Sequence, residues 1–288
     1  MSALQFTIPP ELNGITVKTF LRRRCGMSAR MLSRLKQTEN GMTVRGETIK
    51  SIDKLSSGDI LVLNFPEDKP YIEPVDLDVK VAYEDDNAVV YIKPPHMPVH
   101  PVGEHQSNTL ANAAAFISMQ RGENILFRPV NRLDKDTSGL VLAAKNAFAA
   151  DHLSSHCQKT YIALCEGKLT GSGTIDAPLR VKPGHSIQRE IGEGGARAVT
   201  HYAVLENYGE QYSLLELHLE TGRTHQIRAH MSGIGHPLAG DDMYGGSREV
   251  FPRQCLHCRK MVFLCPVTHR EIEVISDIDF FDEREGGQ

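Results

Sequence analysis

The stretch Asn131-Arg132-Leu133-Asp134-Lys135-Asp136-Thr137-Ser138-Gly139-Leu140 indicates most about the fold of this chain. Thr, Ser and Gly favour a tight turn, because hydroxyls bond to nearby backbone and glycine tolerates unusual φ angles. The apolar run 140–144 that follows predicts a strand. We therefore expect Asp134 on a rigid loop at a sheet edge, where its carboxylate can face a substrate. A lone Asp before such a turn can equally be a turn former or a helix cap.

The rest of the chain alternates short apolar segments with turn residues. Strands are predicted at 42–44, 47–49, 60–65, 79–83, 88–92, 139–144, 161–166, 200–205, 213–219 and 261–264. Helices are predicted at 13–25, 28–37, 108–120, 146–157 and 223–233. The Gly-rich, polar segment 184–196 predicts a mobile loop. Strands outnumber helices without steady βα alternation, which favours an α+β fold around a mostly antiparallel sheet.

Positive charge is concentrated near the N-terminus. Residues 11–64 hold ten Lys or Arg against five Asp or Glu, a net of +5, although the whole chain has a net charge of −4. Ser28 is a good N-cap for the second predicted helix, and Arg45-Gly46 predicts a hairpin turn. The Pro-rich segment 66–77 is typical of a linker. We expect a basic module over 1–65, the linker over 66–77 and a larger domain over 78–288.

Composition restricts the class of protein. The chain has 288 residues, of which 40% are hydrophobic, and no apolar run approaches the roughly 20 residues that span a bilayer. Six cysteines and the lack of a basic start with an apolar stretch favour the cytoplasm. Glycine-rich dinucleotide or phosphate-binding loops are not found, so we expect no cofactor.

Three further segments accompany the Asp134 stretch in a recognisable order. They are Lys159-Thr160-Tyr161-Ile162-Ala163-Leu164, Thr221-Gly222-Arg223-Thr224-His225-Gln226-Ile227-Arg228, and Gly235-His236-Pro237-Leu238 followed by Gly240-Asp241-Asp242-Met243-Tyr244-Gly245. Together they resemble the RluA-type family of RNA pseudouridine synthases over roughly residues 78–275. That family carries His-Arg-Leu-Asp-x-x-Thr-Ser-Gly-Leu in its signature, so Asn131 stands where the family has His.

The resemblance implies an isomerase that converts uridine in RNA to pseudouridine. It makes Asp134 the catalytic carboxylate, as nucleophile or as base, and pairs it with Arg223. Tyr161 takes the active-site tyrosine position, where its ring could stack on uracil and its hydroxyl could help to remove a proton. A base role would need a lowered pKa or a proton relay, because the phenol pKa is near ~10. Arg132 is expected to assist base extrusion, and His225 and Arg228 to shape the pocket or hold phosphate. Asn at position 131 puts any proton-transfer role of that position in doubt.

The predicted helix pair and hairpin of residues 1–65 look like the small RNA-binding module named for ribosomal protein S-four. Its phosphate-facing surface would consist of basic residues from both helices: Arg22, Arg23, Arg24, Arg30, Arg34 and Lys36. Ribosomal RNA is the expected partner and transfer RNA the alternative, with no membrane and a monomeric protein. A different class of function is a non-catalytic RNA-binding or ribosome-assembly protein that retains the fold.

Two zinc hypotheses remain for the histidines and cysteines. His218 and Glu220 with Cys255 and Cys258 superficially match a zinc deaminase signature, although Pro252 is not adjacent to Cys255. A structural site would use Cys255, His257, Cys258 and Cys265. The second stretch also matches the Arg-x-x-Leu-His segment of the RNA-modifying family, which binds no metal, so we expect no metal site.

Overall fold

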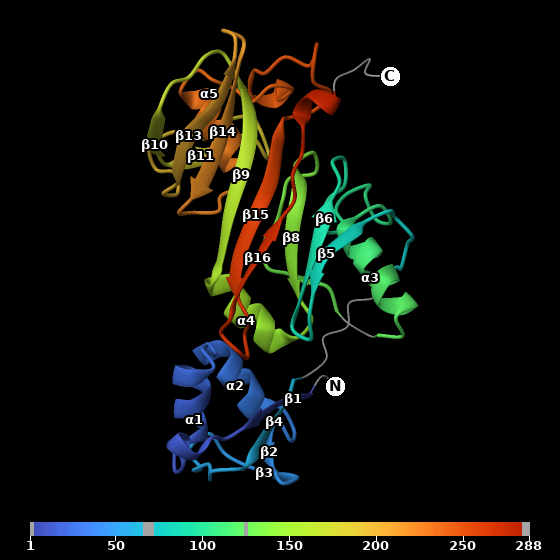
Figure 1. The fold of residues 1–288 in the computed structure, drawn as a ribbon, viewed down its shortest axis with the longest axis vertical. Helices are drawn as coiled ribbons and strands as arrows, with labels where there is room; N and C mark the ends of the chain where they lie inside the picture. Colours follow the sequence, from blue (N-terminus) through green and yellow to red (C-terminus); the bar gives the residue numbers. More distant parts are fainter. Residues whose placement is uncertain (1–2, 66–71, 124–125, 284–288) are drawn as a thin grey trace.

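A computed structural model describes residues 3–65, 72–123 and 126–283 (Figure 1). Residues 3–65 form a four-stranded antiparallel sheet in the order β1-β4-β2-β3, with helices packed on it. The elements are β1 Ala3–Thr7, η1 Pro10–Leu12, α1 Val17–Thr19, the π-helical turn η2 Phe20–Arg24, α2 Ala29–Gln37, β2 Met42–Val44, β3 Glu47–Thr48 and β4 Ile60–Asn64.

Local sequence explains most of this N-terminal part. Ser28 caps α2, since its Oγ accepts a hydrogen bond from the Met31 N–H at 3.1 Å. Arg45 and Gly46 have φ angles of 53° and 81°, which gives the predicted hairpin turn. The helix predicted at 13–25 was too long. The observed helix begins only after its N-cap Thr16 and continues into the π-helical turn η2. Strand β1 was not predicted.

The rest of the described chain is built on a ten-stranded sheet. Its order is β10-β13-β14-β9-β15-β8-β6-β5, with β16 beside β15 and β7 beside β8. The strands are β5 Lys80–Glu84, β6 Ala88–Lys93, β7 Arg128–Pro129, β8 Ser138–Ala144, β9 Cys157–Glu166, β10 Ser172–Asp176, β13 Val199–Tyr208, β14 Tyr212–Leu219, β15 Leu256–Leu264 and β16 Glu271–Ile275. Only β8 and β15 pair in parallel among these strands, so the predicted α+β fold with a mostly antiparallel sheet is confirmed.

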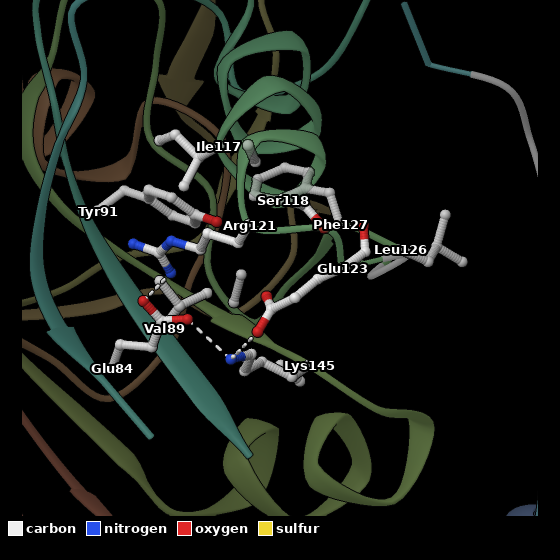
Figure 2. A pocket seen from close by; sticks show the side chains of 13 residues that line it. Glu84, Val89, Tyr91, Ile117, Ser118, Arg121, Glu123, Leu126, Phe127 and Lys145 are labelled. Carbon is white, nitrogen blue, oxygen red and sulfur yellow. Dashed lines mark hydrogen bonds and ion pairs between the residues drawn. The ribbon is translucent and has the colours of Figure 1, made fainter. Parts of the chain in front are cut away.

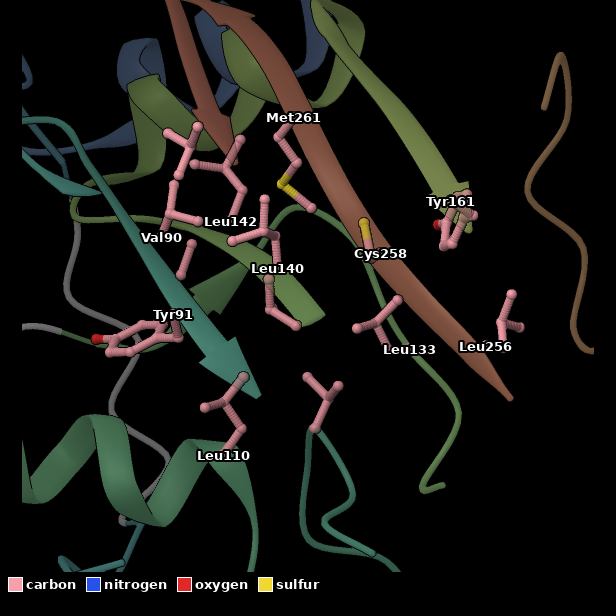
Figure 3. Close-up of a cluster of buried hydrophobic side chains, with 14 of the residues drawn as sticks. Val90, Tyr91, Leu110, Leu133, Leu140, Leu142, Tyr161, Leu256, Cys258 and Met261 are labelled. Atoms are coloured by element: carbon pink, nitrogen blue, oxygen red, sulfur yellow. The ribbon is translucent and has the colours of Figure 1, made fainter. Parts of the chain in front are cut away.

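Helices and short turns complete this part of the chain. The helices are α3 Leu110–Gln120, α4 Ala147–Ser155 and α5 Gln226–Gly233, and the 3-10 turns are η3 Asp242–Tyr244 and η4 Phe280–Glu283. No described helix is long and apolar enough to cross a membrane. All seven residues of β8 are buried, as the apolar run predicted, because β8 lies between β15 and β6 in the middle of the sheet. Its apolar side chains pack with those of neighbouring strands (Figure 3).

The segment 184–196 is not wholly a loop, contrary to the sequence prediction. It contains β12 Arg189–Ile191, which pairs with β11 Leu179–Val181. Two tertiary hydrogen bonds anchor this hairpin: Gln188 Nε2 donates to the Met243 carbonyl at 2.6 Å, and the Arg189 N–H donates to the Tyr244 hydroxyl at 2.8 Å. The partner residues lie more than fifty positions away, so composition alone could not indicate them.

The N-terminal part docks on α4 at the end of the sheet opposite α5 (Figure 1). Phe148 of α4 is fully buried in the apolar cluster of the N-terminal part, where its ring packs edge-on against Phe6. The Ser28 N–H donates to Asp151 Oδ2 at 2.5 Å. His269 Nε2 donates to the Arg24 carbonyl at 3.2 Å. The two parts are therefore in direct contact, although residues 66–71 of the expected linker lie outside the described residues.

His152 should make the stability of this junction depend on pH. Burial first, and then the neighbouring His156 and His269, lower the pKa of His152 from 6.5 to about 4. The unfolded chain takes up a proton near pH 6.5 and the folded chain does not, so stability should fall as pH drops from about 6.5 to about 4. The slope from one such group is about 1.4 kcal/mol per pH unit. Urea unfolding of His152→Leu should show a slope smaller by this amount, because His257 keeps its own pKa of about 4, whereas exposed His185→Leu should keep the wild-type slope. A wild-type slope in His152→Leu would contradict the assignment.

Candidate functional site

Asp134 lies in the loop that enters β8, here called the Asp134 loop (residues 131–138). The Thr137 N–H donates to the Asp134 carbonyl at 3.1 Å, which closes the predicted turn. Asn131 is buried, and its side chain donates to the Leu140 carbonyl at 3.3 Å and accepts from the Leu142 N–H at 2.9 Å. Asn131 thus fixes the loop to β8. We expected this loop at a sheet edge, but it lies at the end of β8, a strand in the middle of the sheet.

Two buried basic side chains, Lys93 and Arg253, donate hydrogen bonds to backbone carbonyls of the Asp134 loop. Lys93, at 0% exposure, donates to the carbonyls of Lys135, Pro94 and Met97 at 2.8–2.9 Å. Three acceptors match the three donors of an ammonium group. Burial, followed by the charge of Arg253, lowers the pKa of Lys93 to about 7. The three carbonyl acceptors favour the ammonium form of Lys93 while burial opposes it, and a pKa of about 7 leaves a substantial charged fraction at neutral pH.

Arg253 supports the other end of the Asp134 loop. It is 2% exposed, and its Nη1 donates to the Asp136 carbonyl at 3.0 Å while Nη2 donates to Ser138 Oγ at 3.1 Å. Gln254 Nε2 adds a bond to Thr137 Oγ1 at 3.1 Å. Lys93, Arg253 and Gln254 were not predicted as site residues from the sequence.

Arg228 is the cation that contacts the Asp134 side chain. Its Nη1 lies 3.2 Å from Asp134 Oδ2, and its Nε and Nη2 bind the Asp241 carboxylate at 2.6 and 2.7 Å. The guanidinium also lies over the Tyr244 ring, 4.9 Å from the ring centroid. Although burial disfavours its charge, hydrogen bonds to Asp241 and the charges of Asp241 and Asp134 raise the pKa of Arg228. Such a cation stabilises the ionised carboxylate.

Arg223 is not the ion-pair partner of Asp134, contrary to the sequence prediction. Its side chain is exposed, and its Nε donates to the Arg197 carbonyl at 3.1 Å. Both arginines belong to the same motif, but α5 starts at Gln226 and turns Arg228 inward while Arg223 stays on the preceding loop. The apolar residues that flank Arg228 in the sequence, Ile227 and Ala229, were the available signal of its burial.

His225 joins the same cluster through an unusual backbone conformation. It is the N-cap of α5 in the left-handed region, with φ of 54°. Its Nε2 lies 3.8 Å from Asp134 Oδ2, and its Nδ1 is 3.1 Å from the Tyr244 hydroxyl. Burial is the main cause that lowers the pKa of His225, so the ring is neutral at pH 7. Arg228, not His225, therefore supplies the positive charge beside Asp134.

Tyr161 forms a wall of the site from β9 and is 7% exposed. Burial, followed by the nearby thiols of Cys258 and Cys157 and the charge of Asp134, raises the pKa of Tyr161 well above its usual value. The lowered pKa that a direct base role would need is therefore not found, and the phenol stays protonated.

These side chains surround one open pocket of about 370 Å³, a volume that includes space continuous with solvent. The pocket lining comprises Arg132, Leu133, Asp134, Thr137, Tyr161, Leu219, Arg223, His225, Gln226, Ile227, Arg228 and Leu256. All six residues that the sequence placed at the catalytic site thus line the same pocket. An acid with a fixed cation, apolar walls and basic residues at the rim can hold a flat, partly polar ring attached to an anionic chain.

A second pocket lies on α3, away from this site (Figure 2). Its charged groups already satisfy one another: Glu84 pairs with Arg121 and lies 2.7 Å from Lys145, which is 3.6 Å from Glu123. A polar ligand would have to displace these ion pairs. The pocket at Asp134 is therefore the candidate site.

The basic residues selected near the N-terminus lie far from the pocket. Arg22, Arg23 and Arg24 lie on η2 with exposed side chains, and Lys36 is exposed on α2. Arg34 is partly buried on α2, and Arg30 belongs to the same helix. The part of the chain that carries them is docked on α4, at the opposite end of the sheet from α5 (Figure 1).

The residues of the two zinc hypotheses are engaged elsewhere. His257 Nδ1 accepts from Ser138 Oγ at 2.8 Å, and its Nε2 donates to the Ser276 carbonyl at 2.9 Å. His218 Nε2 lies 3.1 Å from Glu216. Within residues 3–65, 72–123 and 126–283, no three His, Cys, Asp or Glu side chains are grouped so that they could hold a metal.

Comparison with known proteins connects this geometry to a family. The family model described as RNA pseudouridylate synthase matches residues 87–233. "Uncharacterized RNA pseudouridine synthase YjbO" of Bacillus subtilis is 37% identical and covers 90% of this chain and 93% of its own. "Ribosomal large subunit pseudouridine synthase D" of Vibrio cholerae is 37% identical over 84% of this chain and 81% of its own. The solved structure of human RNA Pseudouridylate Synthase Domain Containing 1 aligns with a TM-score of 0.60, 25% identity, and coverage of 75% and 88%.

The two arginines of the motif should differ sharply in their effect on stability. Arg228→Met leaves Asp241, at 1% exposure, without its cation, and breaking such a buried pair costs about 3–5 kcal/mol. Arg223→Met removes an exposed side chain and should change stability by no more than about 0.5 kcal/mol. Urea unfolding at pH 7 measures both. Equal losses in the two variants would show that Arg228 is not the buried partner.

Proposed function

Because this chain belongs to the family of RNA pseudouridine synthases, it is an RNA-modifying isomerase, and we propose that Asp134 is its catalytic carboxylate. The observation that carries the proposal is the ion pair between Asp134 and Arg228 inside an apolar-walled pocket. The reaction breaks the N1–C1′ bond of a uridine and rejoins the base to the ribose through C5. C5 loses a proton and N1 gains one, so atoms and electrons balance without a redox partner.

The pocket suits either chemical role of the carboxylate. Attack on the substrate and removal of a proton both need Asp134 ionised. Arg228 favours that form at 3.2 Å, and Asp241 keeps the guanidinium in place by a two-pronged contact. The support of the loop carbonyls by Lys93 and Arg253 limits movement of the carboxylate relative to the sugar.

Tyr161 and the basic rim residues have separate roles in this proposal. The Tyr161 ring packs against the uracil, and its protonated hydroxyl acts only through hydrogen bonding or a proton relay. Arg132 is exposed at the pocket, where it can fill the space left by an extruded nucleotide. Arg223 is exposed beside it and suits contact with phosphate. His225 shapes the pocket as a neutral ring.

Ribosomal RNA is the proposed substrate, supported by similarity to the "Ribosomal large subunit pseudouridine synthase D" proteins of Vibrio cholerae and Pseudomonas aeruginosa. We assign RNA docking to residues 1–65, linkage to 66–77 and catalysis to 78–288. The free thiols of all six cysteines suit the reducing cytoplasm. The proposed docking residues are Arg22, Arg23, Arg24, Arg30, Arg34 and Lys36.

Asp134→Asn should abolish isomerisation. The assay is tritium release from RNA labelled at C5 of uridine and isolated from cells that lack this protein. We expect the rate to fall at least about 10²-fold, the lower range for a positioned acid–base group, with RNA affinity retained. Asp136→Asn is the matched control, because the same charge is removed from the same loop but its Oδ1 faces His96 at 2.9 Å.

The outcomes of this assay separate the candidate functions. Release by wild type and Asp136→Asn but not by Asp134→Asn supports the catalytic assignment, and mapping the new pseudouridines then distinguishes ribosomal from transfer RNA. Release by Asp134→Asn at the wild-type rate would mean that another residue is catalytic. Absence of release with every RNA fraction, although RNA still binds, would favour the non-catalytic binding protein.

Removal of charge from η2 should weaken RNA binding without slowing catalysis. We expect Arg23→Gln/Arg24→Gln to reduce the slope of log affinity against log salt by about 1–2, one for each lost phosphate contact. The rate at saturating RNA should stay within about twofold. Arg22 is left intact because its guanidinium donates to the Met27 carbonyl and holds the turn before α2.

The matched control is Lys50→Gln/Lys54→Gln, which removes the same charge from another exposed turn of residues 1–65. Filter binding at several salt concentrations compares the two double variants. Equal slopes for both would indicate a general charge effect and would contradict the docking role of η2. Substitution is preferable to deletion of residues 1–65, because deletion would expose Phe148 and remove the partner of Asp151.

A further inference from the structure

The last described segment of the chain contacts Arg253, the residue that supports the Asp134 loop. After β16, the chain reaches the 3-10 turn η4, whose Phe280 is 3% exposed. Phe280 packs in a small apolar cluster with Phe251, Ile162 and Leu164. Ile162 and Leu164 alternate along β9 with Tyr161, so this cluster lies on the face of β9 opposite the pocket. The packing brings Glu283, at the end of η4, next to Arg253.

Glu283 and the Asp134 loop share the same guanidinium. Both carboxylate oxygens of Glu283 contact Arg253 Nη2, Oε1 at 2.8 Å and Oε2 at 2.7 Å. The same Nη2 donates to Ser138 Oγ at 3.1 Å, and Nη1 donates to the carbonyls of Asp136 and Gln254, each at 3.0 Å. Arg253 Nε is buried and has no hydrogen-bond partner in the described part of the chain. The orientation of the guanidinium therefore depends on contacts at its two outer nitrogens.

Among the contacts of Arg253, the one with Glu283 matters more than those with carbonyls and the Ser138 hydroxyl, because only Glu283 carries a negative charge. A guanidinium that is 2% exposed needs a nearby anion, because carbonyls and a hydroxyl only partly offset the loss of water. Without Glu283, Arg253 would move toward water or toward another acid. The Asp136 carbonyl and Ser138 hydroxyl, which it now holds, would move with it. Asp134 is only two residues before Asp136 in the same loop, so its carboxylate would be displaced too. A shift of about 1 Å at a reacting group can cost about 10²-fold in rate.

We propose that Glu283 is a positioning residue for the isomerisation: it holds Arg253 so that the Asp134 loop presents its carboxylate in the reactive position. This inference rests on the proposed role of Asp134. Glu283 pairs with Arg253 and is not part of the pocket lining, and in this proposal it does not contact the RNA. It should therefore influence the catalytic step and leave substrate binding unchanged.

The test is Glu283→Gln in the full chain, assayed by tritium release in two ways. Single turnover with enzyme in saturating excess over labelled RNA gives the rate, and steady-state release at varied RNA concentration gives KM. The amide keeps the shape and removes the charge, so we expect a rate about 10-fold lower per folded molecule, with KM within about twofold. Glu283→Asp keeps the charge on a shorter side chain and should recover part of the rate. The folded fraction of each variant at the assay temperature is measured by circular dichroism.

Glu273→Gln is the matched control, because Glu273 pairs with Lys260 at 2.5 Å on the surface of the β15–β16 hairpin, away from Arg253 and η4 in the sequence. Both of those side chains are more than a third exposed, and the variant should keep the wild-type rate. RNA affinity compared between Asp134→Asn and the Asp134→Asn/Glu283→Gln double variant should be equal within about twofold, which tests whether Glu283 contacts RNA.

Each outcome decides the proposal. A lower rate in Glu283→Gln, partial recovery in Glu283→Asp and an unaffected Glu273→Gln would support it. A lower melting temperature with an unchanged rate per folded molecule would reduce Glu283 to a structural role and overturn it. A rise in KM without loss of rate would also overturn it. Activity in the wild type and none in Asp134→Asn establishes the proposed function independently of these results.

Discussion

The site depends on the two ion pairs that the Arg228 guanidinium makes, one with Asp134 and one with Asp241. The guanidinium joins three distant segments: the loop before the central strand β8, the first turns of α5, and the turn that precedes η3. Burying one cation with two carboxylates is favourable only if every partner is held in place. The sheet provides this, because β8 and β9 both pair with β15 and so fix the distance between the Asp134 loop and Tyr161.

A recurring feature of the molecule is that buried cations hold main-chain carbonyls. Lys93 and Arg253 support consecutive carbonyls of the Asp134 loop, at Lys135 and Asp136. Carbonyl acceptors leave the carboxylate of Asp134 free to face the pocket, while the loop backbone is fixed by charge-assisted hydrogen bonds. Such a loop loses little entropy when substrate binds, which suits a reaction whose fragments must remain together.

Residues 3–65 pack on α4, at the end of the sheet away from α5, and α5 carries the pocket residues Gln226, Ile227 and Arg228 (Figure 1). Phe148 inserts from α4 into the N-terminal apolar cluster, and Asp151 binds the backbone at Ser28, so this part is packed against the sheet at a defined place. Strand β8 separates α4 from the Asp134 loop by about 20 Å, at 3.3 Å per residue. RNA that touches both ends would have to extend well beyond the modified nucleotide.

Local sequence determined the α+β class, the cap at Ser28, the turn at Arg45 and Gly46, the apolar strand β8 and six of the residues that line the pocket. Each of these depends on neighbours within a few positions, or on motifs that the family shares. Tertiary structure alone decided that Arg228 and not Arg223 meets Asp134, that 189–191 form a strand, and that Glu283 reaches Arg253. The two ion pairs join residues 94 and 30 positions apart. Strand β12 is held by hydrogen bonds to residues more than fifty positions away. Ion pairs and hydrogen bonds act over a few ångströms, and only the folded sheet determines which distant side chains come that close.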